Sequence, residues 1–165
     1  MDLGHSQMIK RTDIVTRYYD DVDIFTLFFA RASPGFVEYS DEASPTIMID
    51  YTETDTIVAV SVENASSTLG FPPRHPIGSA MYERTKDIVT VLFVDVVESK
   101  VQWESTDIEQ IVLGYDEAKK IVGLRILKAA DSIARSLSPE EAKQCELKVK
   151  REIQARRGLW GVNKV

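Results

Sequence analysis

The sequence predicts an α+β fold made mainly of antiparallel β-strands: an internally duplicated, pseudo-twofold β-barrel or β-sandwich with a C-terminal helix. Two observations predict it. The stretch "YYDDVDIFTLFF" at residues 18–29 returns further along the chain as "YERTKDIVTVLF" at residues 82–93. Each copy also consists of short β-branched and aromatic runs bounded by polar turns, a pattern that is typical of β-strands.

The duplication extends well beyond the quoted stretch. Residues 18–66 align with residues 82–130 without a gap, and 12 of the 49 aligned positions are identical. A match of this length indicates an internal repeat. We therefore expect a single domain over residues 1–165, built from repeat one at 13–66 and repeat two at 79–130.

Each repeat is expected to hold a series of short strands. In repeat one they are expected at 13–19, 24–30, 36–40, 46–51 and 56–62. In repeat two they are expected at 88–94, 100–104, 110–115 and 120–126. The strands at 24–30 and 88–94 are apolar on both faces, whereas a half-exposed antiparallel strand alternates apolar and polar residues. Both strands are thus expected to be covered on both sides. Each half is marginally stable alone at this size, so we expect the two halves to pack against each other.

The segments outside the repeats have their own signals. The connector at 64–80 contains three of the six prolines, which predicts a stiff, irregular link. A short helix is expected around 129–137. A longer one is expected at 138–158, with Ser138 and Glu141 forming a capping box at its start and Gly158 ending it.

The longer helix carries an apolar stripe. Ala142, Cys145, Val149 and Ile153 are spaced by three and four residues, so they share one face of the helix. This face is expected to dock on the sheet or on a partner copy of the chain.

Charge narrows the classes of partner. The net charge is −6; residues 138–165 contain seven Lys or Arg and four Glu and so carry +3, which leaves −9 for the first 137 residues. An acidic body disfavours nucleic acid or an anionic membrane as the main partner. The single Cys145 forms no internal disulfide, and no signal peptide or membrane-length apolar run occurs. These features predict a cytoplasmic protein.

The two repeats also share a sequence motif at their C-terminal ends. It reads "IVAVSVENAS" at 57–66 and "IVGLRILKAA" at 121–130, after the Tyr-Asp…Asp-aliphatic opening quoted above. The two copies resemble a small, bacterial, β-rich domain-of-unknown-function family whose members end in Val-Gly-aliphatic-Glu-Ile. That family has no established activity. Gene pairing suggests that some members are partners of small RNA-cleaving toxins, so the resemblance implies an antitoxin-like scaffold.

The chain departs from this family pattern at several positions. Ala59 replaces the glycine that Gly123 keeps, Asp55 and Lys119 replace the usual turn glycine, and Arg125 replaces the usual acid. The duplication and the C-terminal helix are additional features. The departures weaken what the resemblance implies about partners.

Several mechanisms are disfavoured by the residues themselves. Asp23 and Asp87 each precede a strand, where an aspartate closes a turn by accepting backbone N–H bonds. His5 and His75 are isolated, and no His, Cys and carboxylate set has metal-ligand spacing. No nucleophile elbow or Gly-rich phosphate loop occurs. We therefore expect neither a metal nor a cofactor.

Two functions stay open. The first is a protein that binds an apolar small molecule between its β halves. If this protein is an enzyme, we expect a cofactor-free cyclase or isomerase of the pericyclic type, which acts through the shape of its cavity and a few hydrogen bonds. The second is a non-enzymatic protein-interaction or antitoxin-like module that binds its partner through an edge strand or the basic C-terminal helix; a homodimer is an open alternative. The candidate ligand-binding residues are the aromatic and hydroxyl side chains Thr26, Tyr39, Tyr51, Ser61, Thr90, Trp103 and Tyr115. Trp160 is a candidate anchor for a protein partner.

Overall fold

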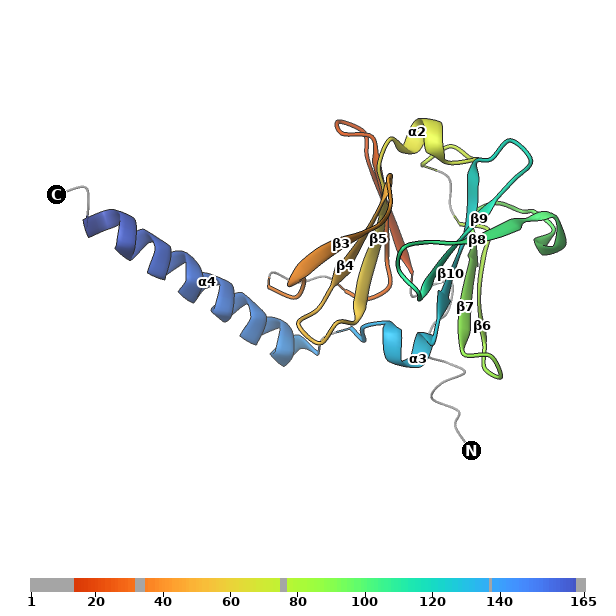
Figure 1. Ribbon diagram of the computed structural model, residues 1–165. Helices are drawn as coiled ribbons and strands as arrows, with labels where there is room; N and C mark the ends of the chain where they lie inside the picture. The colour runs from red at the N-terminus through yellow and green to blue at the C-terminus, as the bar shows by residue number, and fades with distance from the viewer. Residues whose placement is uncertain (1–13, 32–34, 75–76, 137, 163–165) are drawn as a thin grey trace.

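Two five-stranded antiparallel sheets face each other, and a long C-terminal helix leaves the body beside the first sheet (Figure 1). The computed structural model describes residues 14–31, 35–74, 77–136 and 138–162, with the backbone alone for 158–162. The fold is α+β and mainly β, with two similar halves, as predicted. The sheets do not close into a barrel, because each keeps two free edge strands, so the sandwich alternative is correct and the barrel alternative is wrong.

The elements follow one plan in both halves. The first sheet has the order β1-β2-β5-β4-β3 and the second the order β6-β7-β10-β9-β8. The strands of the first are β1 (Val15–Tyr19), β2 (Ile24–Phe28), β3 (Tyr39–Ser44), β4 (Ile47–Tyr51) and β5 (Ile57–Val62). Those of the second are β6 (Ser79–Glu83), β7 (Ile88–Leu92), β8 (Gln102–Ser105), β9 (Ile111–Tyr115) and β10 (Ile121–Leu127). The helices are α2 (Ala65–Thr68), α3 (Ala129–Ser132) and α4 (Pro139–Val162), with a 3-10 turn at Glu98–Lys100.

The backbone repeats in detail. Left-handed residues occur in matching pairs 64 positions apart: Asp23 and Asp87 (φ 54° and 55°), Asp55 and Lys119 (65° and 62°), and Asn64 and Lys128 (both 51°). A positive φ is costly for residues other than glycine. The turn geometry recurs together with the register of β1 with β2 and of β4 with β5, which β6 with β7 and β9 with β10 repeat.

The halves also exchange segments. Leu69, which follows the first sheet, forms a parallel bridge with Ile121 of β10, and Ile133, which follows the second, forms the same bridge with Ile57 of β5. The N–H groups of Gly70 and Ala134 donate to the carbonyls of Ile121 and Ile57, at 2.9 Å in both cases. Each sheet is therefore tied to the segment that leaves the other.

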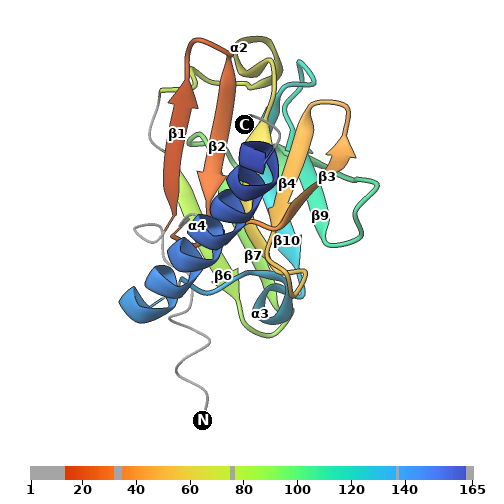
Figure 2. The same ribbon diagram turned by 90° about the vertical axis from the view of Figure 1, so that its left-hand side faces the viewer.

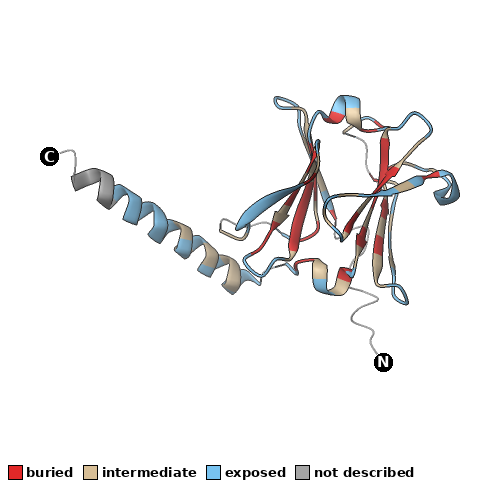
Figure 3. Cartoon of the chain, viewed as in Figure 1, coloured by how far each residue is buried: buried red, intermediate tan, exposed pale blue. Residues whose placement is uncertain are grey.

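The inner faces form one hydrophobic core (Figure 3). Phe25 and Leu27 of β2 and Val89 and Val91 of β7 have no exposed surface. Phe71, from the connector, contacts Phe25 edge-on at a ring-centroid distance of 5.6 Å, and its ring lies 5.2 Å from that of Phe93. The connector is therefore part of the core.

The outer faces of β2 and β7 are only partly covered. Phe25 and Leu27 point inward, whereas Ile24 and Phe28 on the opposite face of β2 keep intermediate exposure, as do Ile88 and Leu92 of β7. The expectation that both faces would be buried is therefore wrong for the ends of these strands. Antiparallel sheets tolerate one partly solvated face.

Each expected strand other than the third lies within two residues of the observed bounds at both ends. The third strand lies at Tyr39–Ser44 rather than 36–40, because the turn before it contains Gly35 with a φ of 82°. The strand at Ser79–Glu83 was not expected by itself; it occupies in repeat two the place that β1 has in repeat one.

The start of α4 confirms the capping box. The N–H of Glu141 donates to the Ser138 hydroxyl and the N–H of Ser138 donates to a Glu141 carboxylate oxygen, each at 3.2 Å. The helix continues through Gly158 to Val162, so the expected end at Gly158 is wrong. It slants away from the outer face of the first sheet instead of lying along it (Figures 1 and 2).

Candidate functional site

The seven sequence-predicted ligand residues do not converge on one place. Thr26 and Ser61 point outward from the first sheet, where they face each other on neighbouring strands and their hydroxyls lie 2.9 Å apart. Thr26 is 4% exposed. The pair satisfies its own hydrogen bonds within the sheet.

Thr90 and Trp103 lie on the outer face of the second sheet. The guanidinium of Arg125 stacks 3.9 Å from the centroid of the Trp103 ring, donates from Nε to the Thr90 hydroxyl at 3.3 Å, and pairs with Glu98. The ring covers Gly114 and Gly123: a Cβ at either position would come within 2.9 Å of it. This cluster is a packed structural unit in which the glycines make room for the ring.

Tyr39, Tyr51 and Tyr115 lie toward the inner faces. Tyr39 pairs with Tyr51 across β3 and β4, with stacked rings 4.9 Å apart. A hydrogen bond from the Tyr39 hydroxyl to Asp55, at 2.6 Å, raises the pKa of Tyr39 to about 12. Burial raises the pKa values of Tyr51 and Tyr115.

A register difference explains why matching aromatic residues point to different faces. Tyr39 pairs with Tyr51, but Trp103, its counterpart, pairs with Gly114, the counterpart of Asp50. A shift of one residue moves a side chain to the opposite face of a sheet. Ala59, the counterpart of Gly123, is fully buried in a small cluster that includes Phe28, its partner on the neighbouring strand, and Phe36.

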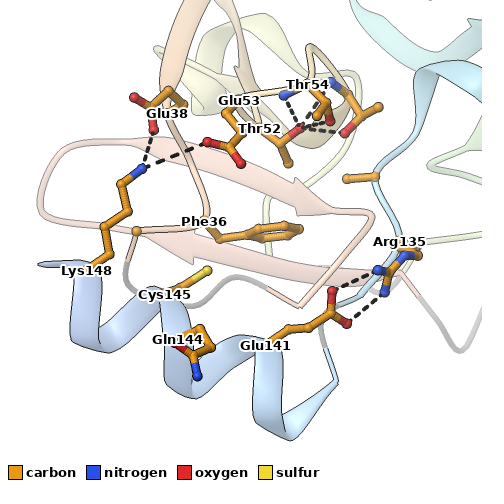
Figure 4. A pocket seen from close by; sticks show the side chains of 13 residues that line it. Phe36, Glu38, Thr52, Glu53, Thr54, Arg135, Glu141, Gln144, Cys145 and Lys148 are labelled. Atoms are coloured by element: carbon orange, nitrogen blue, oxygen red, sulfur yellow. Dashed lines mark hydrogen bonds and ion pairs between the residues drawn. The ribbon is translucent and has the colours of Figure 1, made fainter.

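A cleft of about 430 Å³ lies outside the sandwich, between the first turns of α4 and the first sheet (Figure 4). Its walls are the segment that leads into β3, the turn between β4 and β5, and α4. Phe36 lies in it, and Cys145 of α4 borders it. The sequence signals for the repeat did not point here, because α4, which forms one wall of the cleft, lies outside the two repeats.

The turn that borders the cleft is internally satisfied. The Thr52 hydroxyl lies 2.6 Å from that of Thr56 and 3.0 Å from that of Thr54. In the second half Asp116 takes the place of Thr52 and accepts the N–H groups of Ala118 and Lys120. The threonine cluster therefore replaces an aspartate turn, and its hydroxyls are engaged within the turn.

Ion pairs join α4 to the cleft walls. Arg135 binds Glu141 with two bonds of 2.9 and 2.8 Å, and Lys148 lies 3.6 Å from Glu38 and 4.0 Å from Glu53. The Arg135 pair, helped by the bonds from Ser138, lowers the pKa of Glu141 to about 2. Such a carboxylate is a poor proton acceptor, so it is unsuited to act as a general base.

The cleft is lined mostly by polar and charged residues. Its lining residues include one thiol, Cys145, and no histidine that could deprotonate it. Across the described ranges, no group of three His, Cys, Asp or Glu residues lies close enough to hold a metal ion. His5 and His75 lie outside the described residues, as does the side chain of Trp160. No helix in the described part of the chain is long and apolar enough to cross a membrane.

Two charged surfaces lie on the first half and on α4, and only the basic one, on the C-terminal helix, was expected from the sequence. Residues 38–56, which we call the acidic hairpin, contain six Asp or Glu and no Lys or Arg. Residues 150–162, the distal half of α4, contain four Lys or Arg and one Glu. A finer count of charge within the first repeat would also have found the acidic hairpin.

The comparisons with known proteins reach the first half only. A family model described as "Protein of unknown function (DUF2283)" matches residues 16–66, which contain β2 to β5 and most of β1. This match supports a small domain of unknown function there. No curated protein and no solved structure gives a significant match.

Proposed function

We propose that this protein is a non-enzymatic interaction module that recognises another protein through α4. The observation that carries the proposal is the exposure of the helix beyond the cleft. All seven side chains from Arg151 to Arg157 are exposed (Figure 3), including that of Ile153, which is 42% exposed.

The energetics of helices favour a partner for this segment. An isolated helix of about 12–15 residues is marginal in water, and most helical stability in proteins comes from packing one face. Among the side chains of α4 that the structure describes, those of its first turns obtain such packing, from the cleft and from the ion pairs of Lys148. A partner that covers Ile153 and the arginines around it would stabilise the distal half.

The other expectations stay predictions. An apolar ligand between the two β halves would share its space with the packed side chains of Phe25, Leu27 and Val91. A cyclase or isomerase would need groups that converge on a substrate, and the candidate residues lie on three separate surfaces. The antitoxin-like role and the cytoplasmic location also stay predictions.

The proposal is tested with a photo-crosslinking amino acid placed at Ile153 in the full chain, in cells that produce it. We expect a discrete covalent adduct whose protein component mass spectrometry identifies. The matched control is Met81, an exposed apolar residue on the second sheet, where we expect no such adduct. An uncrosslinked Ile153 variant, or equal labelling at both positions, would contradict the proposal.

The cleft supports a second candidate, the binding of a small molecule beside Phe36. Its volume of about 430 Å³ lies within the range of ligand pockets, roughly 300–1,000 Å³. Native mass spectrometry of the purified chain tests this. A retained mass that disappears in a Phe36→Ala variant supports the candidate, and a bare chain mass contradicts it.

A further inference from the structure

We infer that the partner of α4 is a second copy of this chain: the distal half of α4 from one copy binds the acidic hairpin of the other, and the exchange is reciprocal. This inference rests on the proposed function and adds the identity of the partner. It is carried by charge complementarity between two surfaces of the same molecule.

The acidic hairpin offers more negative charge than its own chain neutralises. Lys148 pairs with Glu38 and Glu53. Asp41, Glu42 and Asp55 are exposed and have no ion pair among the described residues. Glu42 lies on β3, an edge strand whose outer side is unpaired.

The distal half of α4 has the opposite surplus. Lys150, Arg151, Arg156 and Arg157 are exposed there, and none forms an ion pair with another described residue. The helix rises by about 1.5 Å per residue, so residues beyond Lys148 are carried away from the acidic residues of their own chain. Figure 1 shows this departure from the body.

The Lys148 contacts show that α4 and this hairpin are compatible surfaces. A second copy would extend the same type of pairing along the helix. The distal half, about 20 Å long, matches the length of β3 in the hairpin, whose six residues span about 20 Å. Exposed apolar residues lie on both sides of the contact: Ile153 on the helix, and Val37 and Tyr39 at the hairpin.

An acidic protein surface explains the chain better than nucleic acid does. A basic helix also attracts phosphate groups, but the body of −9 repels a polyanion. The same body attracts a second basic helix. Each copy carries both the basic helix and the acidic hairpin. In a twofold dimer each helix therefore binds the hairpin of the other copy, and no surface is left to bind a third copy.

The inference is tested by the mass of the full chain in solution, measured by light scattering after size exclusion. We expect a dimer at low salt that weakens as NaCl rises from about 50 to about 500 mM, since salt screens exposed charge pairs. A chain that is monomeric at both salt concentrations would overturn the inference.

Charge reversal tests the surfaces. The helix variant Arg151→Glu/Arg157→Glu leaves the Glu146–Lys150 and Glu152–Arg156 spacings intact. The hairpin variant is Asp41→Lys/Glu42→Lys. We expect each alone to weaken dimerisation roughly tenfold or more, and a mixture of the two to recover association as a one-to-one heterodimer. The matched control, Glu104→Lys/Glu117→Lys on the second half, is expected to remain dimeric.

The outcomes separate this inference from the proposed function. If mixing does not restore association, or if the control loses it equally, the inference is overturned. A monomeric chain whose Ile153 crosslinks to a different protein overturns the inference and leaves the proposed function standing. Absence of any Ile153 adduct overturns both.

Discussion

At the scale of single residues, the same aspartate organises the start of the second strand in both halves. The Tyr18 hydroxyl donates to Asp23 at 2.6 Å, and Ser66 donates to it from both its N–H and its hydroxyl. Asp87 accepts bonds from Tyr82 and from the N–H of Ala130. These bonds join a β-turn to the helix that ends each repeat. The sequence-based assignment of a turn role to both aspartates therefore has a geometric basis.

Replacing Asp23 by Ala should lower the thermal unfolding midpoint by more than replacing it by Asn. Ala removes the acceptor and is disfavoured at a φ of 54°, whereas Asn tolerates this conformation and keeps an acceptor oxygen. The bonds from Ser66 and Tyr18 lower the pKa of Asp23 below 3.8. Its stabilising effect is thus complete above that pH and is lost as the pH falls through the lowered pKa. Calorimetry of both variants, with Asp21→Ala as an exposed control, checks this; equal midpoints for Ala and Asn would contradict it.

The two glycines under Trp103 allow a second prediction at this scale. Gly123→Ala should destabilise the protein by about 1–3 kcal/mol, because its Cβ would displace the ring or shift β10. In a Trp103→Leu background the same substitution should cost much less, since the ring is gone. Chemical denaturation of the four proteins of this cycle measures the difference. An unchanged cost in the Trp103→Leu background would show that the ring is not responsible.

At the scale of elements, the start of α4 depends on one carboxylate. Glu141 closes the capping box with Ser138 and binds Arg135, which precedes the helix. This contact fixes the direction in which the helix leaves the body, and it borders the cleft. The recognition surface that we propose is therefore oriented by residues at its base.

Replacing Arg135 by Gln should raise the pKa of Glu141 from about 2 toward 4.5, since its main stabilising partner is lost. In the natural chain the carboxylate stabilises the helix start above about pH 4.5, and this contribution is lost as the pH falls toward 2. An NMR titration of the Glu141 carboxyl carbon measures both effects. Lys148→Gln, which removes a cation that does not bond Glu141, is the control and should leave the titration unchanged. A pKa that stays near 2 in R135Q would contradict the assignment.

The sequence was informative where one chemical pattern determines an element. β-Branched and aromatic runs located the second strands, and Ser138 with Glu141 located the start of α4. The sequence was misleading where tertiary contacts determine the register of a strand or the path of a helix. The register of β3 against β4 depends on the turn at Gly35 and on the tight hairpin after Ser44, so Tyr39 could not be assigned to a face. The path of α4 could not be predicted from the apolar stripe of the helix either, because an apolar stripe does not show which surface will cover it.

At the scale of the whole molecule, the two halves depend on each other. Each sheet buries its inner face only against the other sheet, and Phe25 and Phe93 meet across the core at a ring-centroid distance of 5.9 Å. The bridges Leu69–Ile121 and Ile57–Ile133 tie each sheet to the segment that leaves its partner. The connector supplies Phe71 to the same core. The interface between the halves therefore contains most of the buried apolar surface of the protein.

Residues 1–70 should consequently fail to fold as a monomer when they are produced alone. The fragment would expose the inner faces of β2, β4 and β5 to water and would lose the segment at Ile133 that pairs with β5. Units of roughly this size bury a smaller fraction of their surface and are marginally stable even with a complete core. We expect poor dispersion of its amide NMR signals and no cooperative thermal transition, and recovery of both when residues 71–165 are added. The full chain serves as the reference. A dispersed spectrum from monomeric 1–70 would contradict this prediction. It would show that the first sheet folds by itself and does not need the second sheet for its stability.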